Sequence, residues 1–204
     1  LLEMRLRTAR QAAAVPDLRP RERPDGTAPL SFAQQRMWVL DRMDPGAPTW
    51  NIPAPLRLRG ALDVAALERA LNALRQRHES LRTTFAERGD QAVQVIHPYA
   101  PVPLPVDDLS HLDPAAREEE VLRQARVDAN TGFDLVSGPL FRARLLRLAD
   151  GHHALLMCMH HVVSDGWSMG VISRELTALY RAFTAGEADP LPPPALQYAD
   201  FAAW

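Results

Sequence analysis

The sequence predicts a mixed α/β fold, in which helices pack against a mixed β-sheet. Segments with helical periodicity alternate along the chain with short strand-like segments. Two pairs of strand-like segments are separated by tight turns, which is typical of hairpins. The segment from Ala154 to Met159 is apolar at every position, as in a strand that is buried on both faces. With 204 residues, 47% of them hydrophobic, the chain is long enough to bury one sizeable core.

The first part of the chain is predicted to contain a linker, two helices and one strand. Residues 1–14 carry leucines at helical spacing, so a short amphipathic helix is expected there, and the prolines that follow predict a linker up to residue 29. Ser31 is predicted to cap a helix over residues 32–40, and residues 56–59 alternate apolar and polar side chains as a strand does. The folded body is therefore expected to begin at residue 30.

The middle of the chain predicts two more helices and a hairpin. Asp63 is expected to cap a helix that runs to His78 with leucines along one face. Residues 81–86 and 92–96 predict two strands, and Gly89-Asp90 between them predicts the turn of a hairpin. Asp113, followed by a proline, predicts the start of a helix that continues to residue 125.

The last third predicts the centre of the sheet. Residues 140–148 and 153–163 are expected to form neighbouring strands, joined by a turn at Asp150-Gly151. Residues 168–183 have apolar side chains at helical spacing, and residues 198–204 predict a last helix.

Composition excludes several classes of function. The net charge of −2 gives no basic field for nucleic acid or an anionic membrane, and no apolar run approaches the ~18 residues of a membrane helix. The single cysteine, Cys158, cannot form an internal disulfide and is expected to be a small buried hydrophobe. All 23 basic residues are arginine, which indicates a GC-rich, bacterial genome. A cytoplasmic protein with no nucleic-acid or membrane partner is expected.

A polar cluster follows the apolar strand, and three interpretations of it compete. Ser168 lies in a G-x-S-x-G pattern, but the hydrolases with that pattern place their histidine after the serine, and all seven histidines here precede it. His160, His161 and Asp165 lie too close along a strand to converge on one metal ion. The third interpretation is a histidine that acts in acyl transfer. Adjacent strand residues face opposite ways, so only one of the two histidines can face a cavity.

Four ordered segments carry a resemblance to a known family. They are Ser31-Phe-Ala-Gln-Gln-Arg-Met-Trp38, Arg77-His-Glu-Ser-Leu-Arg-Thr-Thr-Phe85, His160-His-Val-Val-Ser-Asp-Gly166 and Tyr198-Ala-Asp-Phe-Ala-Ala-Trp204. The third resembles the HHxxxDG motif of nonribosomal peptide synthetase condensation domains, which are relatives of chloramphenicol acetyltransferase, and the others resemble further motifs of that family. The sequence after Gly166 differs from the motif of epimerisation domains, and the Asp-based motif of heterocyclisation domains is absent.

The resemblance implies a chloramphenicol acetyltransferase-like lobe. Residues 1–29 would be an N-terminal helix and Pro-rich linker, either a docking helix or a connection to an upstream carrier domain. Residues 30–204 would be the N-terminal lobe, and the C-terminal lobe would be absent. In this family the active site lies in a tunnel between the two lobes, so the isolated lobe is expected to be inactive.

The reaction implied by the resemblance is peptide-bond formation. An acyl or peptidyl thioester on one carrier protein is attacked by the amine of an aminoacyl group on another. No cofactor is expected to bind directly, because the substrates are carried on 4'-phosphopantetheine arms. The expected partners are donor and acceptor peptidyl carrier proteins, the C-terminal lobe and an adenylation domain. The alternative function is a non-catalytic platform for carrier-protein docking or gatekeeping.

The resemblance also assigns roles to residues of the cluster. His161 is the expected catalytic residue, either as a general base or as a group that positions the amine. Asp165 is expected to form a buried, structural salt bridge with Arg77. Gly166 is expected to allow a tight turn and to direct its N–H toward the developing oxyanion. His160 and Ser168 are expected to support the site.

Overall fold

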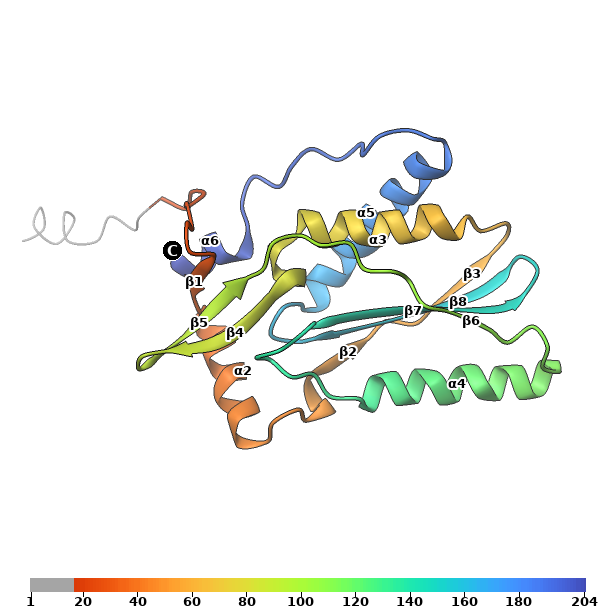
Figure 1. Ribbon diagram of the computed structural model, residues 1–204, viewed down its shortest axis with the longest axis horizontal. Coiled ribbons are helices and arrows are strands. Elements are labelled where there is room, and N and C mark those ends of the chain that lie inside the picture. The colour runs from red at the N-terminus through yellow and green to blue at the C-terminus, as the bar shows by residue number, and fades with distance from the viewer. Residues whose placement is uncertain (1–16) are drawn as a thin grey trace, which may run out of the picture.

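The computed structural model describes residues 17–204, and the expected helix over residues 1–14 lies outside this range. The described part contains two β-sheets, five α-helices and two short 3₁₀ helices (Figure 1). The mixed α/β class is confirmed. Among the residues that the structure describes, none of the helices combines the length and the hydrophobicity of a membrane span.

The larger sheet has five strands and is organised around β8. Its strands are β2 (Asn51–Pro53), β3 (Leu56–Arg59), β6 (Val106–Asp108), β7 (Phe141–Ala149) and β8 (His152–His160). β8 pairs antiparallel with β7 on one edge and with β2 and β3 on the other, while β6 runs parallel to β7. The sheet is therefore mixed, as predicted, and the strand that leads to the two histidines is paired on both edges.

The smaller sheet contains the predicted hairpin. It is formed by β1 (Thr27–Pro29), β5 (Gln91–Ile96) and β4 (Thr83–Arg88), in that order. β4 begins two residues later than expected, because Glu79–Arg82 form a 3₁₀ turn. β1 lies inside the segment that was predicted to be a linker. That prediction is wrong for residues 27–29, whose backbone pairs with β5.

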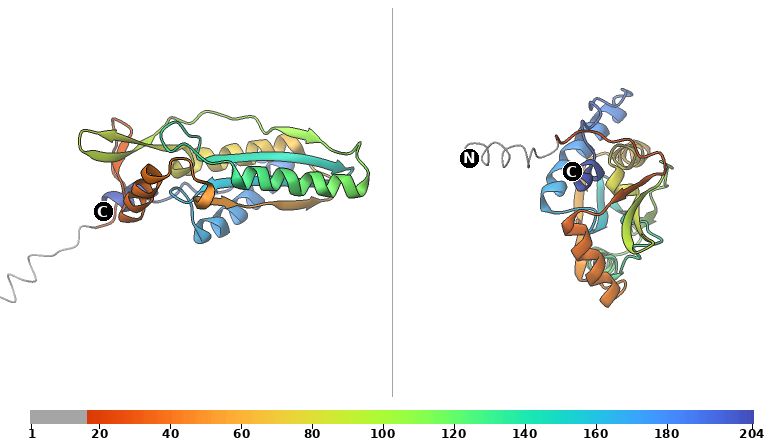
Figure 2. Two further views of the ribbon diagram at one scale, coloured as in Figure 1. Left: turned by 90° about the horizontal axis from the view of Figure 1, so that it is seen from below. Right: turned by 90° about the vertical axis from the view of Figure 1, so that its left-hand side faces the viewer.

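Helices cover both faces of the larger sheet. α3 (Val64–Arg77) and α5 (Gly166–Thr184) pack on one face, and α4 (Pro114–Asn130) packs on the other (Figures 1 and 2). The buried side chains of β8 alternate accordingly. Leu155, Met157 and Met159 join the core beneath α3 and α5, whereas Ala154 and Leu156 join the core beneath α4. This explains why the strand is apolar at every position.

A third apolar cluster joins α2 (Phe32–Met43), the smaller sheet, residues 133–140 and the end of β8. α6 (Tyr198–Ala203) contacts β1 at the same end of the molecule (Figure 1). Trp38 and Phe85 are buried there with ring centroids 6.4 Å apart, and Cys158 is buried in the same cluster. This end of the molecule also contains the end of β8.

Polar side chains cap the N-termini of the main helices, as the sequence predicts. Ser31, Asp63 and Asp113 each accept a hydrogen bond from a backbone N–H in the first turn of the helix that follows. α5 begins two residues earlier than predicted, at Gly166, because Asp165 is its N-cap.

Candidate functional site

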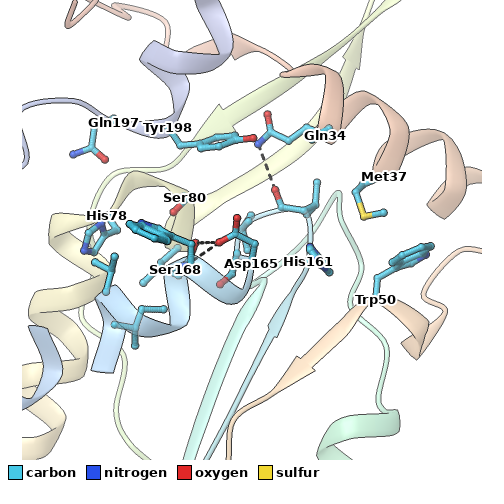
Figure 3. Close-up of a pocket in the computed structure, with 18 of the residues that line it drawn as sticks. Gln34, Met37, Trp50, His78, Ser80, His161, Asp165, Ser168, Gln197 and Tyr198 are labelled. Atoms are coloured by element: carbon cyan, nitrogen blue, oxygen red, sulfur yellow. Dashed lines mark hydrogen bonds between the residues drawn. The ribbon is translucent and has the colours of Figure 1, made fainter. Parts of the chain in front are cut away.

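A cavity of about 660 Å³ lies beside the end of β8. Its walls come from α2, the loop between β8 and α5, the first turns of α5, the turn after α3, and residues 196–198 at the start of α6 (Figure 3). The first, second and fourth sequence motifs therefore meet the histidine motif around one space. Within the described residues, no group of three His, Cys, Asp or Glu side chains is placed to hold a metal ion.

His161 lines this cavity with an exposed side chain. It is the first residue after β8, and its backbone N–H donates to the Trp50 carbonyl at 2.8 Å. The backbone pairing of β8 with its neighbour thus continues one residue beyond the strand. A solvent-accessible imidazole on a fixed backbone can hold a substrate amine and accept a proton from it.

His160 lies in a different environment. Its side chain is 1% exposed, and its ring meets that of Phe133 edge-on at 6.1 Å. Nδ1 of His160 accepts a hydrogen bond from the Val162 N–H at 3.1 Å. Burial, with the neighbouring charge of His161, lowers the pKa of His160 to about 4, so the ring is neutral at neutral pH. The strand alternation correctly predicted that the two histidines would differ.

The expected salt bridge between Asp165 and Arg77 is not formed. Asp165 is exposed at the N-cap of α5, where one carboxylate oxygen accepts hydrogen bonds from the N–H of Ser168 at 2.8 Å and from its hydroxyl at 2.6 Å. The hydroxyl and N–H of Ser168 lower the pKa of Asp165 below its ordinary value. The predicted burial of Asp165 was therefore also wrong.

Arg77 instead pairs with Glu175, in the middle of α5. Its Nε lies 3.1 Å from a carboxylate oxygen that also contacts Nε2 of His78 at 2.6 Å. The guanidinium further donates to the carbonyls of Leu191 and Pro192. The physical reason is the packing of α3 along α5, which brings the end of α3 to the middle of α5 rather than to its first residue.

Gly166 differs from expectation, whereas Ser168 has a structural role at the site. The φ angle of Gly166 is not positive, and a Cβ at this position would meet no atom within 4 Å. The backbone therefore does not require a glycine for a tight turn. The hydroxyl proton of Ser168 is directed to Asp165, so this serine is part of the helix cap and is not activated by a histidine.

Three further residues of the site were missed. Gln34 donates to the Val162 carbonyl, Trp50 accepts from the His161 N–H, and Tyr198 contacts Ser31 through their hydroxyl groups at 2.9 Å (Figure 3). Gln34 and Tyr198 lie inside the first and fourth motifs, and Gln34 also stands three residues after Ser31 as in a capping box. Trp50 acts through its backbone, which leaves no mark in the sequence.

The chain is similar to known proteins over most of its length. A family model described as the condensation domain matches residues 25–204. Chondramide synthase cmdD of Chondromyces crocatus is 49% identical over 176 residues, which are 86% of this chain and 4% of that protein. Phosphinothricin tripeptide synthetase PhsC of Streptomyces viridochromogenes is 45% identical over 204 residues, or 100% of this chain and 19% of that protein.

Solved structures share the fold. The complex of the X-domain and OxyB from teicoplanin biosynthesis contains a chain that matches with a TM-score of 0.83 and 36% identity, covering 94% of this chain and 40% of that chain. The first condensation domain of the CDA synthetase matches with a TM-score of 0.73 and 28% identity, covering 81% of this chain and 41% of that chain. This chain therefore spans about 40% of these structures and a much smaller share of the curated relatives.

Proposed function

Because this chain belongs to the condensation-domain family, we propose that it supplies the histidine-bearing lobe of a domain that forms peptide bonds in nonribosomal synthesis. The observation that carries the proposal is the position of His161. Its imidazole is the exposed one of the two histidines, it faces the cavity, and its backbone is fixed to Trp50.

The proposed reaction joins two carrier-bound substrates. The amine of the acceptor attacks the thioester carbonyl of the donor, a C–N bond forms, and the C–S bond breaks. The amine loses one proton, and the leaving sulfur gains one. An α-amino group has a pKa near 8, so a neutral fraction exists at cellular pH, and His161 needs only to hold this amine and pass its proton toward the sulfur.

The rest of the domain is part of the proposal. Both thioester arms must be held with their reacting atoms about 3–3.5 Å apart, and such positioning is worth ~7–11 kcal/mol of the barrier. Here large apolar side chains at the starts of α2 and α5 are open to solvent, with Phe32 at 90% and Trp167 at 82% exposure, and Trp167 lines the cavity. We therefore expect the 204-residue chain alone to form no product. Its proposed partners are the second lobe, an adenylation domain, and donor and acceptor carrier proteins with phosphopantetheine arms.

The test measures product from loaded donor and acceptor carrier proteins. It compares this chain alone, this chain joined to the remainder of its domain, and the joined form with His161→Ala. Product is expected from the joined form only. Turnover by the chain alone at the rate of the joined form would contradict the need for a second lobe. Equal product with His161→Ala would contradict the role of His161. Carrier binding without product from any form would support the docking platform instead.

A further inference from the structure

Gln34 is a buried amide whose donors and acceptor are all engaged. Its side chain is on α2 and is 2% exposed. Nε2 donates to Oε1 of Gln94 at 3.1 Å and to the carbonyl of Val162 at 3.4 Å, and Oε1 accepts the N–H of Ser31 at 3.0 Å. A glutamine amide has two N–H donors and one carbonyl, so no donor of Gln34 is left over.

The amide is itself held from two sides. Gln94 of β5 is 2% exposed and donates through Nε2 to the Pro29 carbonyl at 2.8 Å. The hydroxyl of Ser31 accepts the backbone N–H of Gln34 at 3.2 Å. Because the smaller sheet and the start of α2 both fix Gln34, its contact with Val162 joins that part of the molecule to the loop after β8.

The backbone around His161 is held at four consecutive polar groups. The N–H of His161 is bonded to the Trp50 carbonyl, and the N–H of Val162 to the ring of His160. The carbonyl of Val162 is bonded to Gln34, and the N–H of Val163 to the His160 carbonyl. Figure 3 shows Gln34 on the opposite side of this loop from Trp50. Of these contacts, the one to the Val162 carbonyl is made by a side chain of a different sequence motif, that of Gln34 in the first motif.

From these contacts we propose that Gln34 is a positioning residue for His161, which acts through the Val162 peptide; as a statement about catalysis this rests on the proposed function. Without the bond from Gln34, the peptide between Val162 and Val163 is held only by its N–H, which donates to the His160 carbonyl at 3.1 Å within the same turn, and nothing from α2 fixes the loop that carries His161. A misplacement of 1 Å in an active site can reduce a rate by about 100-fold. The geometry of the imidazole, rather than the affinity for substrate, is what Gln34 controls.

The first test observes the His161 ring directly by NMR in this chain. Gln34→Met keeps the length of the side chain and removes its hydrogen bonds. The matched control is Asn72→Leu, because Asn72 is also a buried amide, 8% exposed, and bonds Val102 and Glu68 away from the histidine loop. We expect the ring signals of His161 to shift and broaden in Gln34→Met and to stay unchanged in Asn72→Leu. Unchanged signals in Gln34→Met, or equal changes in both variants, would overturn the proposal.

A second variant covers the case in which Gln34→Met does not fold. Gln34→Glu keeps an oxygen for the Ser31 N–H and loses the donors toward Val162 and Gln94. The same displacement of the His161 signals is expected, and its absence would count against the proposal.

The kinetic test uses the chain joined to the remainder of its domain. For Gln34→Met we expect kcat to fall by about 10-fold or more and KM to stay within about 2-fold. Asn72→Leu should leave both constants unchanged. A rise in KM with unchanged kcat would overturn the positioning role. The NMR result decides the role of Gln34 in orienting His161 even if His161→Ala keeps full activity, so failure of the proposed function is distinguishable from failure of this inference.

Discussion

Asp165 and Ser168 are hydrogen-bonded to each other across the first turn of α5. A single carboxylate oxygen of Asp165 accepts both the N–H and the hydroxyl of Ser168, at 2.8 and 2.6 Å. The aspartate of the histidine motif is thus the N-cap of α5. We expect its contribution to the free energy of unfolding to be that of an ordinary N-cap.

Asp165→Ala is expected to lower the free energy of unfolding by about 1 kcal/mol, the usual contribution of an N-cap. This is well below the ~3–5 kcal/mol that follows when a buried ion pair is broken. Asp165→Asn, which can still accept hydrogen bonds, should retain most of the stability. Urea denaturation of the three proteins measures this, and a loss above about 3 kcal/mol for Asp165→Ala would contradict the cap.

The effect of Asp165→Ala should also depend on pH. Because the native pKa of Asp165 lies below the ordinary value, the unfolded chain binds its proton first as the pH falls. The stabilisation is therefore complete above the ordinary pKa of about 3.9 and is lost as the pH falls through the lower native pKa. The stability difference between the parent and Asp165→Ala should shrink over that range.

Arg77→Ala is expected to destabilise the lobe by about 2 kcal/mol. The Arg77 side chain is only 11% exposed, and its guanidinium connects α3, α5 and the segment at residues 191–192. The loss is smaller than for a fully buried pair because Glu175 keeps its contact with His78.

Arg57→Ala is the control for Arg77→Ala. Arg57 also pairs with a glutamate, Glu118, but its side chain is 43% exposed and its partner's 56%. Such surface pairs contribute less than about 1 kcal/mol. Urea denaturation of Arg77→Ala and Arg57→Ala measures the difference. Equal shifts of the two denaturation midpoints would show that the Arg77 contacts do not stabilise the lobe.

His160 should make the lobe sensitive to acid. Its native pKa is about 4 against an ordinary value of 6.5, so between these values the unfolded chain binds a proton that the folded chain does not. Stability is therefore complete above about pH 6.5 and falls, by on the order of 3 kcal/mol, as the pH drops to about 4. His160→Gln should be less stable at neutral pH but should show a shallower decline. Parallel pH profiles for the two proteins would contradict this.

Cys158 should be unreactive in the folded lobe. Its side chain is 1% exposed, and burial raises the pKa of the thiol. Because the thiolate is the reacting form, a thiol reagent at about pH 8 should label Cys158 slowly without denaturant and rapidly in urea. Rapid labelling of the folded protein would show that this part of the core opens easily.

The elements with strong periodicity could be predicted from the sequence. The paired strands before the histidines, the helices capped by Asp63 and Asp113, and the resemblance carried by four motifs were all confirmed. Strand β8 was predicted to run to residue 163 but ends at His160. Val162 and Val163 are buried although they lie in a turn, which is closed by the Val163 N–H and the His160 carbonyl. Apolar side chains alone do not distinguish such a turn from a strand.

The remaining errors concern contacts between distant segments. β1, β2 and β6 have three residues each, too few to show a periodicity, and they are strands only because of the strands beside them. The partner of Arg77 depends on which turn of α5 lies next to the end of α3. The family resemblance implied that Arg77 would pair with Asp165, but the packing of α3 along α5 places Glu175 beside it instead.

The pairing of β8 on both edges has a consequence for the folding of this chain while the ribosome synthesises it. β2 and β3 end at Arg59, but β8, the strand that pairs with them, begins only at His152 and is therefore far away in the sequence. In the smaller sheet, by contrast, β4 and β5 are separated by only two residues, Gly89 and Asp90. On the ribosome the smaller sheet can close its hairpin early, while β2 and β3 wait with an unpaired edge until β8 has emerged. The segment that completes the larger sheet is the same one that delivers His160 and His161. A nascent chain therefore cannot assemble this sheet without also placing its histidines.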